Sequence, residues 1–393
     1  MMLRLRAGKL IVAGGSRLLG GRIRSKDSFF IFDCGDLEKR LPAEGRQDTP
    51  TIASDKILAA AFSSSGDYFA LTDDSKRLVL FRTTPTWEKI SIRWVCRRCT
   101  SLTFSPCERR ILVADKSGDV FSFSVQAAQE EGHLELGHLS MLLDLVVTQD
   151  GQYIITCDRD EKIRVSQRGA PHVITAFCLG HTEFVSQLAS AQEKLLLSGS
   201  GDGTLRLWRY ETGQELQRFT IGSIERPEDS QNDTREIKRF AVSRICCSGE
   251  QVAVLCDGIP GIYLFSISTS PHLTHQQYVA LPYVPVDMDF EDLTSLWVLL
   301  SVKENPIALL QYREQRWQLV PLDDRMKEVS ETIRKNWEQM EGSVTLENRF
   351  SALYKAVVDN MASYLQKKEA RIQTEKRKSS TGQTGAAAKI QKM

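Results

Sequence analysis

A histidine, a serine and an aspartate in the middle of the chain have the side-chain types of a hydrolytic triad. Gly180-His181 is followed by Ser198 and Asp202, and the segment ends at Trp208. In hydrolases the histidine takes the serine proton while the aspartate orients the imidazole. The alternative is a buried structural tetrad, in which His181, Ser198, Asp202 and Trp208 share hydrogen bonds. We favour the tetrad, because all four residues lie where a repeated sheet motif requires them.

Alternating glycines in the same segment resemble a phosphate-binding loop. Gly199, Gly201 and Gly203 lead into Leu205–Trp208, which has the alternating pattern of a strand. A dinucleotide-binding fingerprint instead follows a strand and opens a helix. Two further glycine pairs fail the same test, at Gly14-Gly15 and Gly20-Gly21. The sequence therefore predicts no bound cofactor, and no site for a methyl donor.

Cys96-Arg-Arg-Cys99 is the one cysteine pair with metal-ligand spacing. Structural zinc needs about four ligands, and no second pair matches, so we expect free thiols and no metal. The nine cysteines show no regular framework. No run of about 18 apolar residues predicts a membrane span, and no apolar leader is visible. These features favour a reducing compartment, nucleus or cytosol, and no membrane partner.

The candidate residues belong to a segment that recurs along the chain. Trp208 is preceded by Ser166, Phe123 and Phe81 at intervals of 42, 43 and 42 residues. Short apolar runs separated by Gly/Asp turns at this period are typical of a WD-type β-propeller, with one four-stranded blade per repeat. Seven strand pairs are expected: Leu10–Ala13 with Phe29–Phe32, Ile57–Phe62 with Tyr68–Leu71, Thr100–Phe104 with Ile111–Val113, Leu142–Val147 with Tyr153–Thr156, Val185–Leu188 with Leu195–Leu197, Val242–Cys246 with Val252–Leu255, and Val284–Phe290 with Leu296–Leu300.

The predicted architecture is thus all-β, a seven-bladed WD40 β-propeller over residues 1–321 with a C-terminal α-helical extension. Polar segments 36–54 and 222–236 break the period and are expected to be inter-blade inserts. After residue 321 the apolar residues recur at helical spacing, which predicts amphipathic helices over 322–371. The first stripe comprises Met326, Val329, Ile333, Trp337 and Met340, and the second runs from Phe350 to Leu365.

Basic residues are concentrated at the end of the chain. The formal net charge is +1, yet residues 366–393 hold eight Lys/Arg against two acidic residues. Residues 372–393 are expected to be a basic disordered tail. Such a tail favours electrostatic binding of phosphate, which needs no base readout. Lys376-Arg-Lys378 is also compatible with a nuclear import signal alone.

A charged segment interrupts the regular repeat at Asp158–Val165. By position, Asp160 corresponds to Asp202 and Arg164 corresponds to Arg206. One interpretation is that Asp160 and Arg164 form an ion pair within the blade. The other is that the turn binds a protein partner, since the arginine guanidinium pairs well with carboxylates at interfaces.

Several sequence blocks together resemble one family. They are Thr72–Leu78, Val113–Val120, Leu134–Met141, Asp158–Val165, Leu179–Val185 and the C-terminal motifs Leu353-Tyr-Lys-Ala, Asp359-Asn, Ser363-Tyr-Leu and Lys367-Lys-Glu369. These blocks are similar to the WD-repeat, non-catalytic subunit of the eukaryotic tRNA guanine-N7 methyltransferase. The similarity covers most of the chain, and it is weaker in the inserts, the last two blades and the extreme tail.

The resemblance implies a scaffold that binds and stabilises a separate Rossmann-type methyltransferase subunit as a heterodimer. That partner holds S-adenosylmethionine and methylates a guanine in the tRNA variable loop, so this chain supplies no catalytic residue. The family's partner-contacting turn maps onto Arg159–Arg164, with Lys162 and Arg164 as salt-bridge donors. Its C-terminal helix, near both enzyme and tRNA, maps onto Phe350–Arg371. The implied partner-binding residues are Arg159, Asp160, Glu161, Lys162, Arg164, Tyr354 and Tyr364, and the implied tRNA-binding residues are Lys367, Lys368 and Arg371.

Two other functions stay open at this stage. The chain could be a WD-repeat adaptor or substrate receptor of a cullin-type ubiquitin ligase, although Trp208-Arg209 departs from the Trp-Asp pattern common in such receptors. An enzymatic activity of its own, as hydrolase or methyltransferase, is less favoured because no triad or cofactor site survives the structural interpretation.

Overall fold

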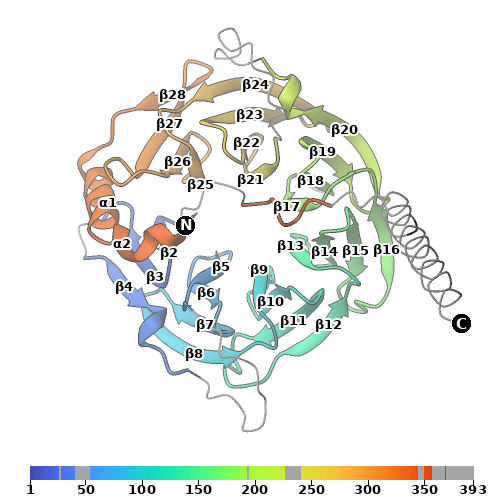
Figure 1. Ribbon diagram of the computed structural model, residues 1–393, viewed down its shortest axis with the longest axis horizontal. Coiled ribbons are helices and arrows are strands. Elements are labelled where there is room, and N and C mark those ends of the chain that lie inside the picture. Colours follow the sequence, from blue (N-terminus) through green and yellow to red (C-terminus); the bar gives the residue numbers. More distant parts are fainter. Residues whose placement is uncertain are drawn as a thin grey trace, which may run out of the picture. The chain divides into compact units, whose positions relative to one another are not determined.

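The computed structural model describes residues 1–25, 28–39, 54–192, 194–225, 240–343, 349–355 and 368. The chain divides into two compact units, Met1–Leu353 and Tyr354–Met393. The first unit is a ring of seven four-stranded antiparallel sheets, numbered here as blades 1–7 (Figure 1). This confirms the seven-bladed propeller that the period of the repeat predicts.

Every blade is built from four consecutive strands. Blades 1 to 3 comprise β1 (Met2–Arg6), β2 (Lys9–Gly14), β3 (Arg17–Arg22) and β4 (Phe30–Asp33); β5 (Ile57–Phe62), β6 (Tyr68–Asp73), β7 (Arg77–Arg82) and β8 (Glu88–Trp94); β9 (Cys99–Phe104), β10 (Arg110–Asp115), β11 (Asp119–Ser124) and β12 (His133–Gly137). Blades 4 and 5 comprise β13 (Leu142–Val147), β14 (Tyr153–Asp158), β15 (Ile163–Gln167) and β16 (Ile174–Cys178); β17 (Val185–Ser190), β18 (Leu195–Ser200), β19 (Thr204–Arg209) and β20 (Gln214–Thr220). Blades 6 and 7 comprise β21 (Val242–Ser248), β22 (Gln251–Cys256), β23 (Gly261–Ile267) and β24 (Leu273–Ala280); β25 (Pro285–Phe290), β26 (Ser295–Leu300), β27 (Ile307–Arg313) and β28 (Arg316–Val320).

The recurring anchor positions occupy equivalent places in successive blades. Trp208 lies opposite Leu196 in blade 5, and Ser166 lies opposite Ile154 in blade 4. Phe123 and Phe81 hold the same place, opposite Ile111 and Phe69. The interval of about 42 residues is therefore the distance along the chain between the third strands of neighbouring blades.

Blade 1 differs from its expected arrangement. Leu10–Ala13 and Phe29–Phe32 fall in β2 and β4, which are not neighbours, because β3 lies between them. The strand β3 contains Gly20 and Gly21, and a Cβ added at Gly20 would lie 3.0 Å from the Trp87 ring. Close packing of aromatic rings explains why glycines interrupt the apolar pattern that would have revealed this strand.

The ring closes between blades 1 and 7 without sharing a strand. The backbone N–H groups of Leu3 and Leu5 on β1 donate to Asp287 and Asp289 on β25, at 2.9 and 2.8 Å. Arg4 adds an ion pair with Asp287 at 2.6 Å. Carboxylates thus accept the hydrogen bonds that a neighbouring strand would otherwise accept.

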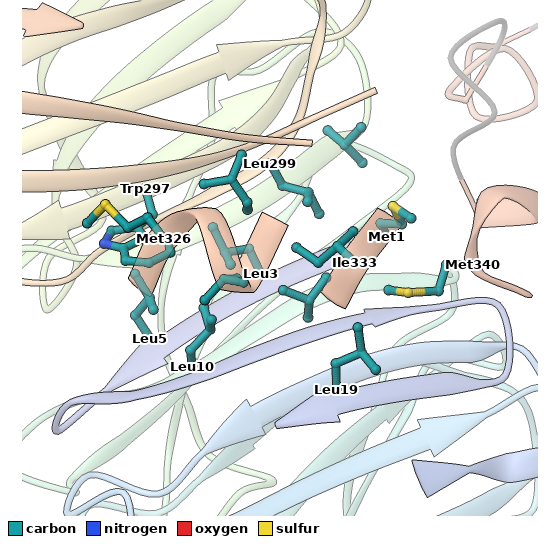
Figure 2. Packing of buried hydrophobic residues seen from close by; sticks show 14 of the residues in the cluster. Met1, Leu3, Leu5, Leu10, Leu19, Trp297, Leu299, Met326, Ile333 and Met340 are labelled. Carbon is teal, nitrogen blue, oxygen red and sulfur yellow. The ribbon is translucent and has the colours of Figure 1, made fainter. Parts of the chain in front are cut away.

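Two helices cover this closing seam. Helix α1 (Asp324–Lys335) is capped by Asp323, whose side chain accepts from the Met326 N–H, and α2 (Trp337–Met340) follows. Met326 and Ile333 pack with Leu3, Leu10 and other residues from β1, β2, β3, β26 and β27 (Figure 2). The whole predicted stripe is buried: Met326, Val329, Ile333, Trp337 and Met340. The described part of the first unit also has three 3-10 turns, at Cys34–Asp36, Ile221–Ser223 and Glu341–Ser343.

The second helical stripe begins differently from its prediction. Residues 349–353 form turns, with the Leu353 N–H donating to the Phe350 carbonyl at 2.9 Å, so the expected helix does not start at Phe350. Most of that stripe, the insert cores 40–53 and 226–239, and all of the tail lie outside the described residues. Among the described helices, none is long and apolar enough to span a membrane.

Candidate protein-interaction site

The four residues of the triad-like segment form one buried hydrogen-bond network in blade 5. His181 lies between β16 and β17, Ser198 on β18, Asp202 in the β18–β19 turn and Trp208 on β19. The Trp208 indole donates to the Ser198 hydroxyl at 2.8 Å, and that hydroxyl lies 2.7 Å from Nε2 of His181. Nδ1 of His181 lies 2.9 Å from Asp202. The network joins the inter-blade connection to the sheet, as the tetrad interpretation requires.

The direction of these hydrogen bonds determines the state of His181. An indole N–H only donates, so the Ser198 hydroxyl accepts from Trp208 and donates to Nε2 of His181. Nδ1 of His181 is then protonated and donates a hydrogen bond to the Asp202 carboxylate. Burial lowers the pKa of His181, with Asp202 opposing the shift, which agrees with a neutral imidazole. Ser198 is 0% exposed, so this histidine has no accessible nucleophile to activate.

Blade 4 contains a parallel network that the sequence interpretation placed incorrectly. His138, in the β12–β13 connection, lies 3.1 Å from Asp158 through Nδ1 and 2.7 Å from the Thr156 hydroxyl through Nε2. The expectation that Asp160 would take the place of Asp202 is therefore wrong. Asp158 ends β14 with its side chain buried, whereas Asp160 is exposed in the turn beyond it. The Gly-His pairs at 137–138 and 180–181 were the available signal.

The turn between β14 and β15 presents charges of both signs, and we call Arg159–Lys162 the charged turn. Asp160 and Lys162 are exposed, while Arg159 and Glu161 are half-buried. The Lys162 N–H donates to Asp158 at 3.0 Å, and Arg159 N–H donates to the Met141 carbonyl at 3.0 Å. The backbone is thus held at both ends while side chains reach solvent.

Arg164 does not belong with these exposed residues. It is 9% exposed, and its guanidinium donates to Ser166, to the Gly137 carbonyl and to the Pro171 carbonyl at 2.9, 2.9 and 3.0 Å. Burial lowers the pKa of Arg164. Its three donations stay within blades 3 and 4 and hold β15 in place. The expected ion pair with Asp160 is therefore not formed, and the implied salt bridge from Arg164 to the partner stays a prediction.

The segment that follows the helices returns to this face of the propeller. The Phe350 ring lies 5.4 Å from the Phe184 ring, centroid to centroid, and Phe184 is fully buried. Nε of Arg159 donates to the Leu353 carbonyl at 3.2 Å. Residues 350–353 therefore run from blade 5 to the charged turn, and neither contact was anticipated from the sequence.

The other implied site residues fall in the second unit. Tyr354 is its first residue, and Lys368 is exposed and helical. Tyr364, Lys367 and Arg371 lie outside the described residues. The roles of these five residues in binding the partner and tRNA stay predictions.

The remaining candidates for chemistry have ordinary surroundings. Cys99 is buried, and burial raises its pKa to about 12, whereas Cys96 is exposed. Across the described part of the chain, no group of three or more His, Cys, Asp or Glu side chains could hold a metal ion. Gly201 in the β18–β19 turn packs under Phe184, since a Cβ there would lie 2.4 Å from that ring.

Known structures share this fold. The chain superimposes on the WD40 repeats of RRP9 with a TM-score of 0.62 at 15% identity, covering 76% of this chain and 86% of that one. For a structure of U3-55K the TM-score is 0.61 at 15% identity, with 81% and 91% covered. At this identity the likeness shows the fold alone.

Sequence relatives are more informative. The family model described as the tRNA methyltransferase TRM82 WD40 domain matches residues 37–135 and 125–318. The tRNA (guanine-N(7)-)-methyltransferase non-catalytic subunit wdr4 of Xenopus laevis is 60% identical over 398 residues, which is 100% of this chain and 99% of that protein. The corresponding Homo sapiens subunit is 49% identical, covering 91% and 88%, and that of Danio rerio is 45% identical, covering 97% and 94%. The chain therefore belongs to the family of WD-repeat non-catalytic subunits of tRNA (guanine-N(7)-)-methyltransferases.

Proposed function

We propose that this chain stabilises the catalytic subunit of a heterodimeric tRNA guanine-N7 methyltransferase and binds it through the charged turn. The observation that carries the proposal is the contrast within that turn. Its backbone is held by Asp158 and Met141, while the side chains of Asp160 and Lys162 reach solvent. A rigid backbone that presents charged groups is suited to pairing with a second protein.

The mechanism would be preorganisation of the partner. The described residues that resemble catalytic groups are used in blade structure, so the chemical step and the S-adenosylmethionine belong to the catalytic subunit. Binding energy from the propeller would hold mobile elements of that subunit in their active arrangement. Binding to the folded form also stabilises it by mass action.

The C-terminal unit would add attraction for tRNA. The last residues of the first unit, 350–353, are bound beside the charged turn. Lys367, Lys368 and Arg371 would then neutralise tRNA phosphates near the catalytic subunit, without reading bases. The nucleus is the proposed compartment.

Reconstitution tests this proposal. Guanine-N7 methylation of tRNA is measured with each purified subunit alone and with both together. We expect activity from the pair, little from the catalytic subunit, and none from this chain. Methylation by this chain alone, or equal activity of the catalytic subunit with and without it, would refute the scaffold role.

A truncation separates the tRNA contribution. Removing residues 367–393 should leave the heterodimer intact, weaken tRNA binding and make log Kd less dependent on log salt concentration. An unchanged salt slope would mean that the basic tail serves nuclear import only.

A further inference from the structure

Exposed apolar side chains are concentrated on blade 4, which carries the charged turn, and on blade 3 beside it. Eleven large hydrophobic side chains are exposed among the described residues, and six of them lie between residues 134 and 179, on blades 3 and 4. They are Leu134, Leu139, Val173, Ile174, Phe177 and Leu179. Single exposed apolar residues are normal, but a cluster marks an interaction surface.

Leu139 lies directly on the blade 3 side of the charged turn. Its side chain is 109% exposed, whereas the residues around it are bound to the turn. His138 is hydrogen-bonded to Asp158, and the Met141 carbonyl accepts from the Arg159 N–H. The His138 N–H also donates to the Gly118 carbonyl at 2.8 Å. Leu139 is therefore a fully exposed leucine on a backbone held from three sides.

Leu179 lies at the opposite side of the same turn. Cys178 pairs with Ile163, the residue after Lys162, so Leu179 continues past the end of that pairing. Leu179 is 61% exposed, and Phe177, which pairs with Arg164, is 41% exposed. Further along, Thr182 is bound to Asp202 through its N–H at 3.1 Å. The charged turn is thus flanked by two apolar side chains on ordered segments.

We infer that Leu139 and Leu179 are apolar anchors for the catalytic methyltransferase subunit, on either side of the charged turn. This inference deepens the proposed function and depends on it. Protein interfaces combine a desolvated apolar centre with a polar rim, and affinity comes mainly from the buried anchors. The partner surface would present two apolar depressions, separated by carboxylates for Lys162 and a cation for Asp160.

The rigid setting of these leucines strengthens the assignment. Ordering a flexible loop on binding reduces affinity. Here the hydrogen bonds of His138, Arg159 and Thr182 already order the segments in the free chain. The energy of burying each side chain would therefore appear largely as affinity.

The test uses the full chain and the purified catalytic subunit of the same source. Leu139→Asp and Leu179→Asp are compared with Leu293→Asp and Leu319→Asp, which alter exposed leucines on blade 7 (58% and 50%). Calorimetry measures Kd at low and high salt, and the melting temperature of the isolated chain is measured for each variant. We expect each of the first two substitutions to weaken binding about tenfold to hundredfold at both salt concentrations. The blade 7 variants should bind like the wild type, and no melting temperature should change.

Wild-type affinity for both Leu139→Asp and Leu179→Asp would overturn the inference and leave the proposed function standing. The inference would also be overturned if either variant melted at a lower temperature than the wild type. It would be overturned too if sedimentation of the isolated chain gave a different mass for the variant than for the wild type. Those results would mean that the chain itself, or a second copy, covers the leucines. Absence of binding by the wild type would instead refute the proposed function together with this inference.

Discussion

The turns that follow β14 and β18 are held by similar hydrogen-bond networks, but the side chains that they present differ in charge and exposure. In blade 5, His181 joins Ser198 and Asp202, and in blade 4, His138 joins Thr156 and Asp158. The blade 5 turn contains Gly201, which packs under Phe184, and the Phe350 ring lies against Phe184. The blade 4 turn has charged residues instead, and these reach solvent.

Comparing the two turns distinguishes the residues that hold a blade together from the residues that are available to a partner. A histidine, a hydroxyl and an aspartate fix the backbone in both cases, so they identify the fold rather than the function. The side chains that the network does not use are the ones available to a partner. The blade 4 turn keeps the backbone frame of blade 5 and has exposed charges where blade 5 has the covered Gly201, which is why we propose it as the partner-binding site.

The largest expected effect comes from replacing Trp208 of blade 5 with serine, the residue at the equivalent position of blade 4 (Ser166). Trp208→Ser should lower the free energy of unfolding by about 3–5 kcal/mol, because it removes a buried indole and leaves a cavity. Urea denaturation measures the loss. Ser166→Ala, at the matching position, should cost only about 1 kcal/mol. Similar losses in the free energy of unfolding for the two substitutions would mean that Trp208 contributes no more to its blade than Ser166 does.

The next effect tests the internal role of Arg164. Arg164→Gln should lower the free energy of unfolding by about 2–4 kcal/mol, since the buried guanidinium and its hydrogen bonds to Ser166, Gly137 and Pro171 are lost. Lys162→Gln, two residues away and exposed, should change it by less than about 0.5 kcal/mol. If Arg164→Gln melts like the wild type and only partner binding fails, Arg164 acts at the interface after all.

A charge reversal in the turn should affect binding alone. Lys162→Glu should weaken binding of the catalytic subunit by about 1–2 kcal/mol at low salt, and by less at high salt because ions screen exposed charges. Its melting temperature should match the wild type. The control is Lys327→Glu on α1, an exposed lysine on the opposite side of the ring. A drop in melting temperature for Lys162→Glu would show that the charged turn is structural.

The smallest effect is the contribution of His181 to pH dependence. Its folded-state pKa lies below the ordinary value of 6.5, so the unfolded chain binds the proton more readily as pH falls. The stability that neutral His181 contributes is present above pH 6.5 and is lost as pH falls below it. Melting curves from pH 7.5 to 5.5 measure this, with His181→Gln as reference. A variant whose melting follows the wild-type pH profile would exclude His181 as the source.

Sequence patterns predicted the fold closely where the signal repeats. The strand pairs of blades 2 to 7 lie in adjacent strands, and the stripe from Met326 to Met340 forms the buried face of α1 and α2. Blade 1 was less visible, because Gly20 and Gly21 interrupt the apolar pattern of β3. The charged turn was visible as a departure from the repeat, but position alone assigned Asp160 to a network that Asp158 occupies.

The sequence by itself determined the number of blades, the residues of the tetrad and the helical extension. Those features depend on periodicity and on turn chemistry, which neighbours along the chain set. Only the tertiary structure decided which charges are available, because exposure depends on distant partners. Arg164 is buried by carbonyls from β12 and the β15–β16 connection, and Arg159 is bound to Leu353, 194 residues away. Leu139 resembles any core leucine in the sequence, and the packing around His138 leaves it fully exposed.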